Sequence, residues 1–140
     1  VADALSKLDG QKIVWMMLPA GDVTEKQIHD LIPLLNPGDI IVDGGNSNYK
    51  RTVKMGKLLE EHNLGFMDCG TSGGVWGLDN GYCLMVGASN EVASAVEPVL
   101  RALAVTQQNG WAHVGPVGSG HFTKMIHKKS YQHDIELICL

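Results

Sequence analysis

The chain has 140 residues, a formal net charge of −4 at pH 7, 44% hydrophobic residues and 19% charged residues. The share of hydrophobic residues is too high for a disordered chain. The small net negative charge argues against the cluster of Lys and Arg side chains that binding to nucleic acid needs. No apolar run approaches the roughly 20 residues that span a bilayer. We therefore expect one folded domain, or part of one, with no nucleic-acid or membrane partner.

The cysteines indicate free thiols rather than a metal or disulfide framework. Cys69, Cys83 and Cys139 are scattered, odd in number and without a C-x-x-C pair, so no metal site is expected. Free thiols fit a reducing cytoplasm. Residues 1–11 lack a basic segment followed by an apolar stretch and do not resemble a signal peptide.

The first elements are a buried strand, a short helix and a second buried strand. Residues 12–18 (KIVWMML) form the continuous apolar run typical of a strand buried on both faces. Thr24 and Gln27 match a capping box, which predicts a helix that begins after Thr24. Pro33 predicts that this helix is short or kinked. Residues 39–43 (DIIVD) are the second predicted strand.

A polar helix is predicted next, over about residues 48–62. Val53, Leu58 and Leu59 are expected to face inward. The opposite, cationic face is expected to be solvated and consists of Lys50, Arg51, Lys54 and Lys57.

Three more strands and two helices are predicted in the rest of the chain. Strands are expected at residues 65–69, 82–86 and 110–114. Ser89 caps a helix with the cleanest 3.6-residue apolar period in the sequence. Glycines within residues 115–120 open a last helix that continues toward the C-terminus.

Strands that alternate with helices predict an α/β fold with a doubly wound, mainly parallel sheet. Ligands bind beyond the carboxyl ends of the strands in such sheets. The four glycine-bearing loops that follow strands are therefore expected to share one functional edge. These loops are residues 19–22, 44–47, 70–81 and 115–120.

The glycine pattern before the last helix allows two interpretations. Gly115, Gly118 and Gly120 lie in a different order from the G-x-G-x-x-G dinucleotide fingerprint. They could let an anion approach the N-terminus of the helix, or they could form a plain tight turn. A phosphate-binding Walker loop is excluded because His121 and Phe122 follow the last glycine.

Lys124 is a candidate general base, although its spacing alone favours a solvated basic face. It lies one turn into the last helix and shares a helix face with His121 and His127. The positive end of the helix and nearby cations favour a lowered lysine pKa, as a general base requires. The alternative is a solvated basic face. Ser72, Gly73 and Gly74 could form an anion nest or a mobile loop.

Three motifs occur in one order: DGGNS at residues 43–47, SGG at residues 72–74 and GSGHFTKMIH at residues 118–127. Together they resemble 6-phosphogluconate dehydrogenase, a family of the β-hydroxyacid dehydrogenases. The resemblance covers about residues 12–127, and residues 70–87 look most like the shorter bacterial branch, which tends to use NAD. It implies a Rossmann-like domain over residues 1–118 and the start of a helical substrate and dimerisation domain over residues 119–140.

The resemblance also implies a reaction. Enzymes of this family oxidise 6-phosphogluconate at C3 and decarboxylate it to ribulose 5-phosphate with NAD or NADP, usually as homo-oligomers. Lys124 would accept the proton of the C3 hydroxyl, and Asn46 would touch both nicotinamide and substrate. The resemblance assigns cofactor contacts to Leu18, Pro19 and Ala20, and substrate contacts to Ser72, Gly73, Gly74 and His127.

The sequence departs from the family pattern in ways that bear on activity. The dinucleotide fingerprint would precede residue 1, and the helical domain would continue beyond residue 140. Lys128 and Tyr131 stand where the family has Asn and a proton-donating Glu, and Arg51 stands where it usually has Asp. We therefore expect trace catalysis from this chain. The alternatives are another β-hydroxyacid dehydrogenase, or a non-catalytic module that assembles through an open sheet edge.

Overall fold

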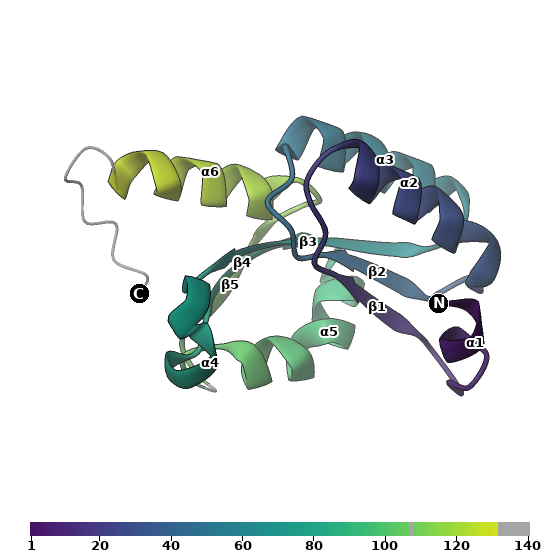
Figure 1. Cartoon of the computed structure of the whole chain (residues 1–140), viewed down its shortest axis with the longest axis horizontal. Coiled ribbons are helices and arrows are strands. Elements are labelled where there is room, and N and C mark those ends of the chain that lie inside the picture. Colours follow the sequence, from purple (N-terminus) through teal and green to yellow (C-terminus); the bar gives the residue numbers. More distant parts are fainter. Residues whose placement is uncertain (107, 132–140) are drawn as a thin grey trace.

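A computed structural model describes residues 1–106 and 108–131, with backbone alone for residues 128–131. One five-stranded sheet, in the order β1-β2-β3-β4-β5, has α2, α3 and α6 on one face and α5 on the other (Figure 1). The elements are α1 (Ala2–Leu5), β1 (Ile13–Met16), α2 (Asp22–Leu31), η1 (Ile32–Leu34), β2 (Ile40–Asp43), α3 (Tyr49–Glu61), β3 (Gly65–Ser72), η2 (Gly74–Trp76), α4 (Gly77–Asn80), β4 (Cys83–Ala88), α5 (Asn90–Leu103), β5 (Trp111–Gly115) and α6 (Ser119–Tyr131).

The inner strand β2 is buried on both faces, as its apolar run predicts. Ile40 and Val42 belong to a core on the α5 side, with Val96 of α5. Ile41 belongs to a second core on the opposite side, with Ile28 of α2 and Leu59 of α3. Alternate side chains therefore fill two hydrophobic layers, one on each face of the sheet.

The sheet is mainly parallel, as predicted, but β3 and β4 are antiparallel. Strands β1, β2 and β3 run in one direction, and β5 runs parallel to β4 in the other. A parallel crossover needs about a dozen residues or more, usually including a helix. Residues 73–82 hold only the short elements η2 and α4, so the chain returns beside β3 in the opposite direction.

Helix boundaries confirm some local signals and contradict one. Ser89 caps α5 as predicted, because its Oγ accepts a hydrogen bond from the Val92 N–H at 3.3 Å. The capping box at Thr24 is wrong, because α2 begins at Asp22 and Thr24 lies inside it. The Thr24 hydroxyl instead donates to the Pro19 carbonyl at 2.9 Å. α2 ends at Leu31, as the proline two residues later predicts.

Helix α3 buries a slightly different face from the predicted one. Leu59 is fully buried and Leu58 half-buried, but Val53 is 36% exposed. Thr52 and Met55 are buried instead. The inward stripe 52-55-59 is offset by one residue at its start, because the polar Thr52 finds a buried partner on α6.

Glycines allow α6 to lie directly on the sheet. A Cβ on Gly120 would lie 2.6 Å from the Asp68 carbonyl oxygen of β3. A Cβ on Gly87 of β4 would lie 2.8 Å from the Gly120 nitrogen, and one on Gly70 of β3 would lie 2.5 Å from the Lys124 Cβ. The first two turns of α6 therefore contact the backbone of β3 and β4.

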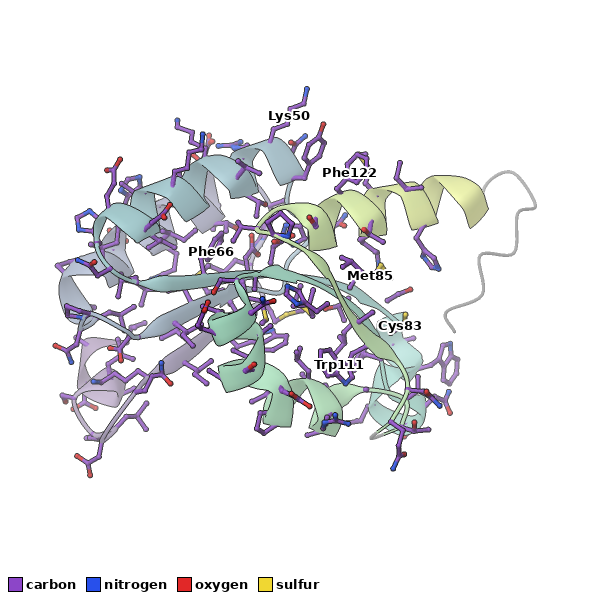
Figure 2. All side chains as sticks on the ribbon, turned by 180° about the vertical axis from the view of Figure 1, so that it is seen from behind. Lys50, Phe66, Cys83, Met85, Trp111 and Phe122 are labelled. Carbon is purple, nitrogen blue, oxygen red and sulfur yellow. The ribbon has the colours of Figure 1, made fainter. Side chains whose placement is uncertain are left out.

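Cys69 is buried, and Cys83 at the start of β4 is half-buried (Figure 2). Both cysteines lie outside any disulfide among the described residues. Burial raises the pKa of the Cys69 thiol to about 12. Cys139 lies outside the described residues. Within the described part of the chain, every helix is too short or too polar to span a bilayer.

We expect Gly120→Ala to lower the free energy of unfolding by about 1–3 kcal/mol, as overpacked cores do. The added methyl group would force α6 away from the sheet. Urea unfolding followed by circular dichroism measures the change. Ser119→Ala, one residue earlier in the same turn, is the control and should cost less than about 0.5 kcal/mol. Equal stability of the two variants would contradict the close packing of α6.

Candidate active site

A cavity of about 640 Å³ opens where β1, β2 and β3 end, and one side of α6 closes it. It brings together the two residues that follow β1, the DGGNS loop, the SGG loop and α6. The lining residues are Met17, Leu18, Gly44, Gly45, Asn46, Thr71, Ser72, Gly74, Tyr82, Lys124 and His127.

Lys124 reaches this cavity by a different route from the predicted one. Because β5 is antiparallel to β1–β3, loop 115–120 leaves the sheet in the opposite direction from the other three loops. The expectation that all four loops share one edge is therefore wrong. Helix α6 turns back over β3 and β4, and its second turn, rather than the loop, carries Lys124 to the end of β3.

The Lys124 side chain is anchored at the end of β3. Its Nζ donates a hydrogen bond to the backbone carbonyl of Thr71. Ser72 is the next residue along the strand and lines the same cavity. The ammonium group therefore lies beside the SGG loop rather than on a fully solvated helix face.

The N-terminus of α6 binds an anion, but that anion is the chain's own Asp68. Its carboxylate accepts the Gly118 N–H at 2.6 Å and the His121 N–H at 2.7 Å. The hypothesis of an external anion at this helix end is therefore wrong. Asp68 is fully buried in β3, and desolvation raises its pKa against the opposing effect of these hydrogen bonds.

His121 is buried between α6 and α3. Its Nδ1 lies 2.9 Å from the Thr52 hydroxyl and 3.8 Å from an Asp68 oxygen. The residue is 3% exposed, and its Nε2 has no hydrogen-bond partner in the part of the chain that the structure describes. The sequence placed His121 on the face of Lys124 but gave no sign of this burial.

The DGGNS loop is held by its own aspartate. The Asp43 carboxylate accepts a hydrogen bond from the Gly45 N–H at 3.0 Å and from the Ser47 hydroxyl at 2.6 Å. These bonds fix the turn, while the Asn46 side chain remains exposed. Asn46 lines the first cavity and also a neighbouring one.

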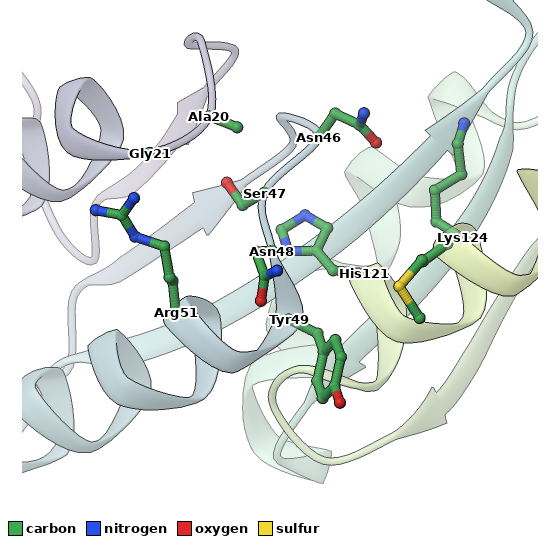
Figure 3. A pocket seen from close by; sticks show the side chains of 10 residues that line it. Ala20, Gly21, Asn46, Ser47, Asn48, Tyr49, Arg51, His121 and Lys124 are labelled. Carbon is green, nitrogen blue, oxygen red and sulfur yellow. The ribbon is translucent and has the colours of Figure 1, made fainter.

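The neighbouring cavity, of about 620 Å³, lies between the N-terminal ends of α2 and α3 and the first turns of α6 (Figure 3). Its ten lining residues are Ala20, Gly21, Asn46, Ser47, Asn48, Tyr49, Arg51, His121, Lys124 and Met125.

Arg51 is not simply solvated, contrary to the prediction for its helix face. Its Nε donates to a Glu25 carboxylate oxygen, and its Nη2 donates to Asp22 at 2.5 Å. These bonds tie α3 to the first turn of α2. The hydrogen bond from Arg51 holds the pKa of Glu25 below its ordinary value, and both carboxylates raise the pKa of Arg51.

The structure gathers most of the predicted site residues but not all of them. Ala20 lines the second cavity instead of the first. Pro19 is exposed, and its carbonyl is engaged by Thr24. Gly73 has a φ of 140° in the turn that follows β3. The predicted residues that share the first cavity are Leu18, Asn46, Ser72, Gly74, Lys124 and His127.

Sequence reasoning missed Asp68, Thr52 and the Thr71 carbonyl. The charge of Asp68 inside the apolar strand GFMDC was a usable signal, because an unpaired buried carboxylate is costly. A backbone carbonyl carries no signal in the side-chain pattern. Among the described residues, no group of three or more His, Cys, Asp or Glu side chains is arranged to hold a metal ion.

The Rossmann-like sheet, with a lysine, an asparagine and a serine grouped at its strand ends, defines an NAD(P)-binding domain of the dehydrogenase class. Residues 1–115 match the family model described as the NAD binding domain of 6-phosphogluconate dehydrogenase. The chain belongs to that family.

Named relatives agree with this assignment. The NAD(+)-dependent, decarboxylating 6-phosphogluconate dehydrogenase of Haloferax volcanii is 41% identical over 127 residues, which cover 91% of this chain and 41% of that protein. The decarboxylating 6-phosphogluconate dehydrogenase of Synechococcus elongatus is 40% identical over 138 residues, 97% of this chain and 29% of that protein. The chain thus spans less than half the length of both relatives.

Solved structures share the fold. Plasmodium falciparum 6-phosphogluconate dehydrogenase has a TM-score of 0.83 at 29% identity, over 91% of this chain and 28% of that one. Mycobacterium tuberculosis 3-hydroxyisobutyrate dehydrogenase has a TM-score of 0.82 at 24% identity, over 93% of this chain and 43% of that one.

We expect Asp68→Ala to cost about 1–3 kcal/mol of unfolding free energy for the buried N–H groups that it leaves without an acceptor. Asp68→Asn keeps one acceptor oxygen and should lose less. Urea unfolding of both variants provides the comparison. An Asp68→Ala protein as stable as the parent chain would show that the carboxylate does not hold α6.

The Arg51–Glu25 pair predicts a pH-dependent contribution to stability. Because the folded-state pKa of Glu25 is lowered, the pair stabilises the fold above the ordinary pKa of 4.5, and this stability is lost as the pH falls through the lowered value. Glu25→Gln should therefore destabilise the chain at pH 7 and have a much smaller effect near pH 3. Glu60→Gln on α3, whose carboxylate forms no ion pair with any residue that the structure describes, is the control. A loss from Glu25→Gln that is independent of pH would contradict the assignment.

Proposed function

We propose that this chain forms part of the active site of an enzyme that oxidises and decarboxylates 6-phosphogluconate with NAD or NADP. The observation that supports this proposal most directly is that Lys124, Asn46 and Ser72 line one cavity, with the Lys124 amine at the end of β3. The family assignment supports the same reaction. The two named relatives are longer proteins, so the complete reaction is proposed for the whole enzyme.

The residues of the first cavity fit a nicotinamide ring. Met17 is 63% exposed at the rim, and with Leu18 it offers an apolar surface to a planar ring. The Asn46 amide can pair with a carboxamide, and the glycines beside it leave room for close approach. When bound, the oxidised nicotinamide supplies the acceptor for a hydride.

In this proposal each side chain has one task. Lys124, in its neutral form, accepts the proton of the C3 hydroxyl while the hydride leaves C3, which yields a 3-keto acid. Loss of CO₂ from that acid gives an enediol, and its reprotonation gives ribulose 5-phosphate. Ser72, with the neighbouring SGG glycines, binds the carboxylate end, His127 binds hydroxyls, and Asn46 orients substrate and cofactor together.

The boundary between the cofactor domain and the helical domain is proposed near residue 118. Helix α6 starts at Ser119 and lies against β3 and β4, so it links the two domains while carrying Lys124. The proposal includes a cytoplasmic homo-oligomer, as expected from the resemblance.

Turnover tests the proposal directly. With 6-phosphogluconate and either NAD or NADP, we expect the 140-residue chain to form reduced nicotinamide at trace rates or below, because it spans less than half of its relatives. Lys124→Met should lower any turnover by about 10²–10⁴-fold, the usual contribution of a positioned general base. If the parent chain turns over and Lys124→Met turns over equally fast, Lys124 is not the general base. A panel including 3-hydroxyisobutyrate tests the alternative β-hydroxyacid substrate.

Substrate binding is an independent measurement. Calorimetric titration with 6-phosphogluconate should show weaker binding by Ser72→Ala, while Arg101→Gln, on α5 at the opposite face, should match the parent chain. Equal affinities in all three proteins would show that the SGG loop does not hold the substrate.

A further inference from the structure

The second cavity contains a buried nitrogen with no assigned task. His121 lines it, and the imidazole side chain is 1% exposed. Nδ1 faces Thr52, while Nε2 has no hydrogen-bond partner among the described residues. Leaving a buried polar atom without a hydrogen bond is unfavourable, so a ligand that pairs with this nitrogen would gain free energy of binding.

The remaining polar groups of this cavity are mostly hydrogen-bond donors. Arg51 uses Nε and Nη2 for Glu25 and Asp22, whereas Nη1 takes part in neither pair and lies beside Gly21. The N-cap residue of α2 is Gly21, which provides no side-chain cap, and Lys124 lines the cavity on the α6 side. No carboxylate is among the ten lining residues.

The neutral tautomer that suits this arrangement carries the proton on Nε2. The Thr52 hydroxyl lies 2.9 Å from Nδ1 and 3.3 Å from the Asn48 carbonyl oxygen. When its proton is donated to Nδ1, the proton of the neutral imidazole is on Nε2. A protonated imidazolium, facing Asp68 at 3.8 Å, presents the same Nε2–H donor. In both forms the donor matches an oxygen acceptor that carries negative charge.

We propose that this cavity binds a small oxyanion of the size of phosphate, through His121 Nε2–H and Arg51 Nη1, beside the N-cap residue of α2, Gly21. Figure 3 shows His121 between the DGGNS loop and α6, with Arg51 and Lys124 on either side. Charge-assisted hydrogen bonds from these donors are stronger than neutral ones. The site goes beyond the proposed dehydrogenase function and does not require it.

This oxyanion site borders the candidate active site. Asn46 and Lys124 line both cavities. An oxyanion held beside Lys124 therefore acts on the same amine that faces the substrate. Such coupling between the two sites is reciprocal.

Inorganic phosphate, titrated into the 140-residue chain at constant ionic strength with sodium chloride, tests the site without substrate or cofactor. We expect a saturable rise in Tm and a saturable ¹⁵N shift of the His121 imidazole. The His127 imidazole, in the first cavity, should shift much less. No saturable response, or a shift confined to His127, would overturn the proposal.

Two variants locate the donors. His121→Asn keeps a polar atom near Thr52 but removes Nε2, and it should weaken phosphate binding about tenfold, the loss of one charge-assisted hydrogen bond. Arg51→Gln, at an exposed position, should weaken binding by a similar factor even if the His121 variant fails to fold. Arg101→Gln is the matched control and should bind like the parent chain. Unchanged affinity in Arg51→Gln would contradict the site.

Activity of the complete enzyme is not part of this test. Phosphate binding at His121, together with equal 6-phosphogluconate binding by Ser72→Ala and the parent chain, would support the oxyanion site and count against the proposed substrate contacts. Weaker 6-phosphogluconate binding by Ser72→Ala, with no phosphate response at His121, would do the opposite. The two proposals therefore fail separately.

Discussion

The carboxylate of Asp68 determines where the last helix lies. It is buried in the middle of β3 and accepts two backbone N–H groups from the start of α6, one on each oxygen. Burial disfavours its charge and raises its pKa, and the helix N–H groups and dipole offset part of that cost. The helix that carries Lys124 is thus fixed to the sheet by a charge in the sheet itself.

Glycine makes this attachment geometrically possible. Gly87 and Gly120 lie so close together that a Cβ on either one would contact backbone atoms of the other element. Gly70 leaves the space into which the Lys124 stem fits, and the amine then bonds to the Thr71 carbonyl. The position of the candidate base therefore depends on backbone packing over β3 and β4.

The two cavities meet at the DGGNS loop and at Lys124. Asp43 holds the turn of that loop, and Asn46 extends from it into both spaces. His121 and Lys124 lie three residues apart on α6, one turning toward α3 and the other toward β3. Among the described residues, only the side chains of Asn46 and Lys124 line both cavities, so a ligand in one cavity contacts side chains that also face the other. These shared contacts are the physical basis for coupling between the two cavities.

The sequence by itself predicted the five strands and the capped helix α5, because apolar periodicity and capping signals are local. It grouped Leu18, Asn46, Ser72 and Lys124 only through the resemblance of its short motifs to a known family. It could not determine that β4 runs against β3, since strand direction depends on whether a connection packs as a crossover helix. It also missed the burial of His121 and the partners of Asp68, which lie 50 and 53 residues away along the chain. Only the tertiary structure decided these contacts, because the hydrogen-bond donors to a buried carboxylate come from segments that are distant in sequence and become neighbours only when the chain packs.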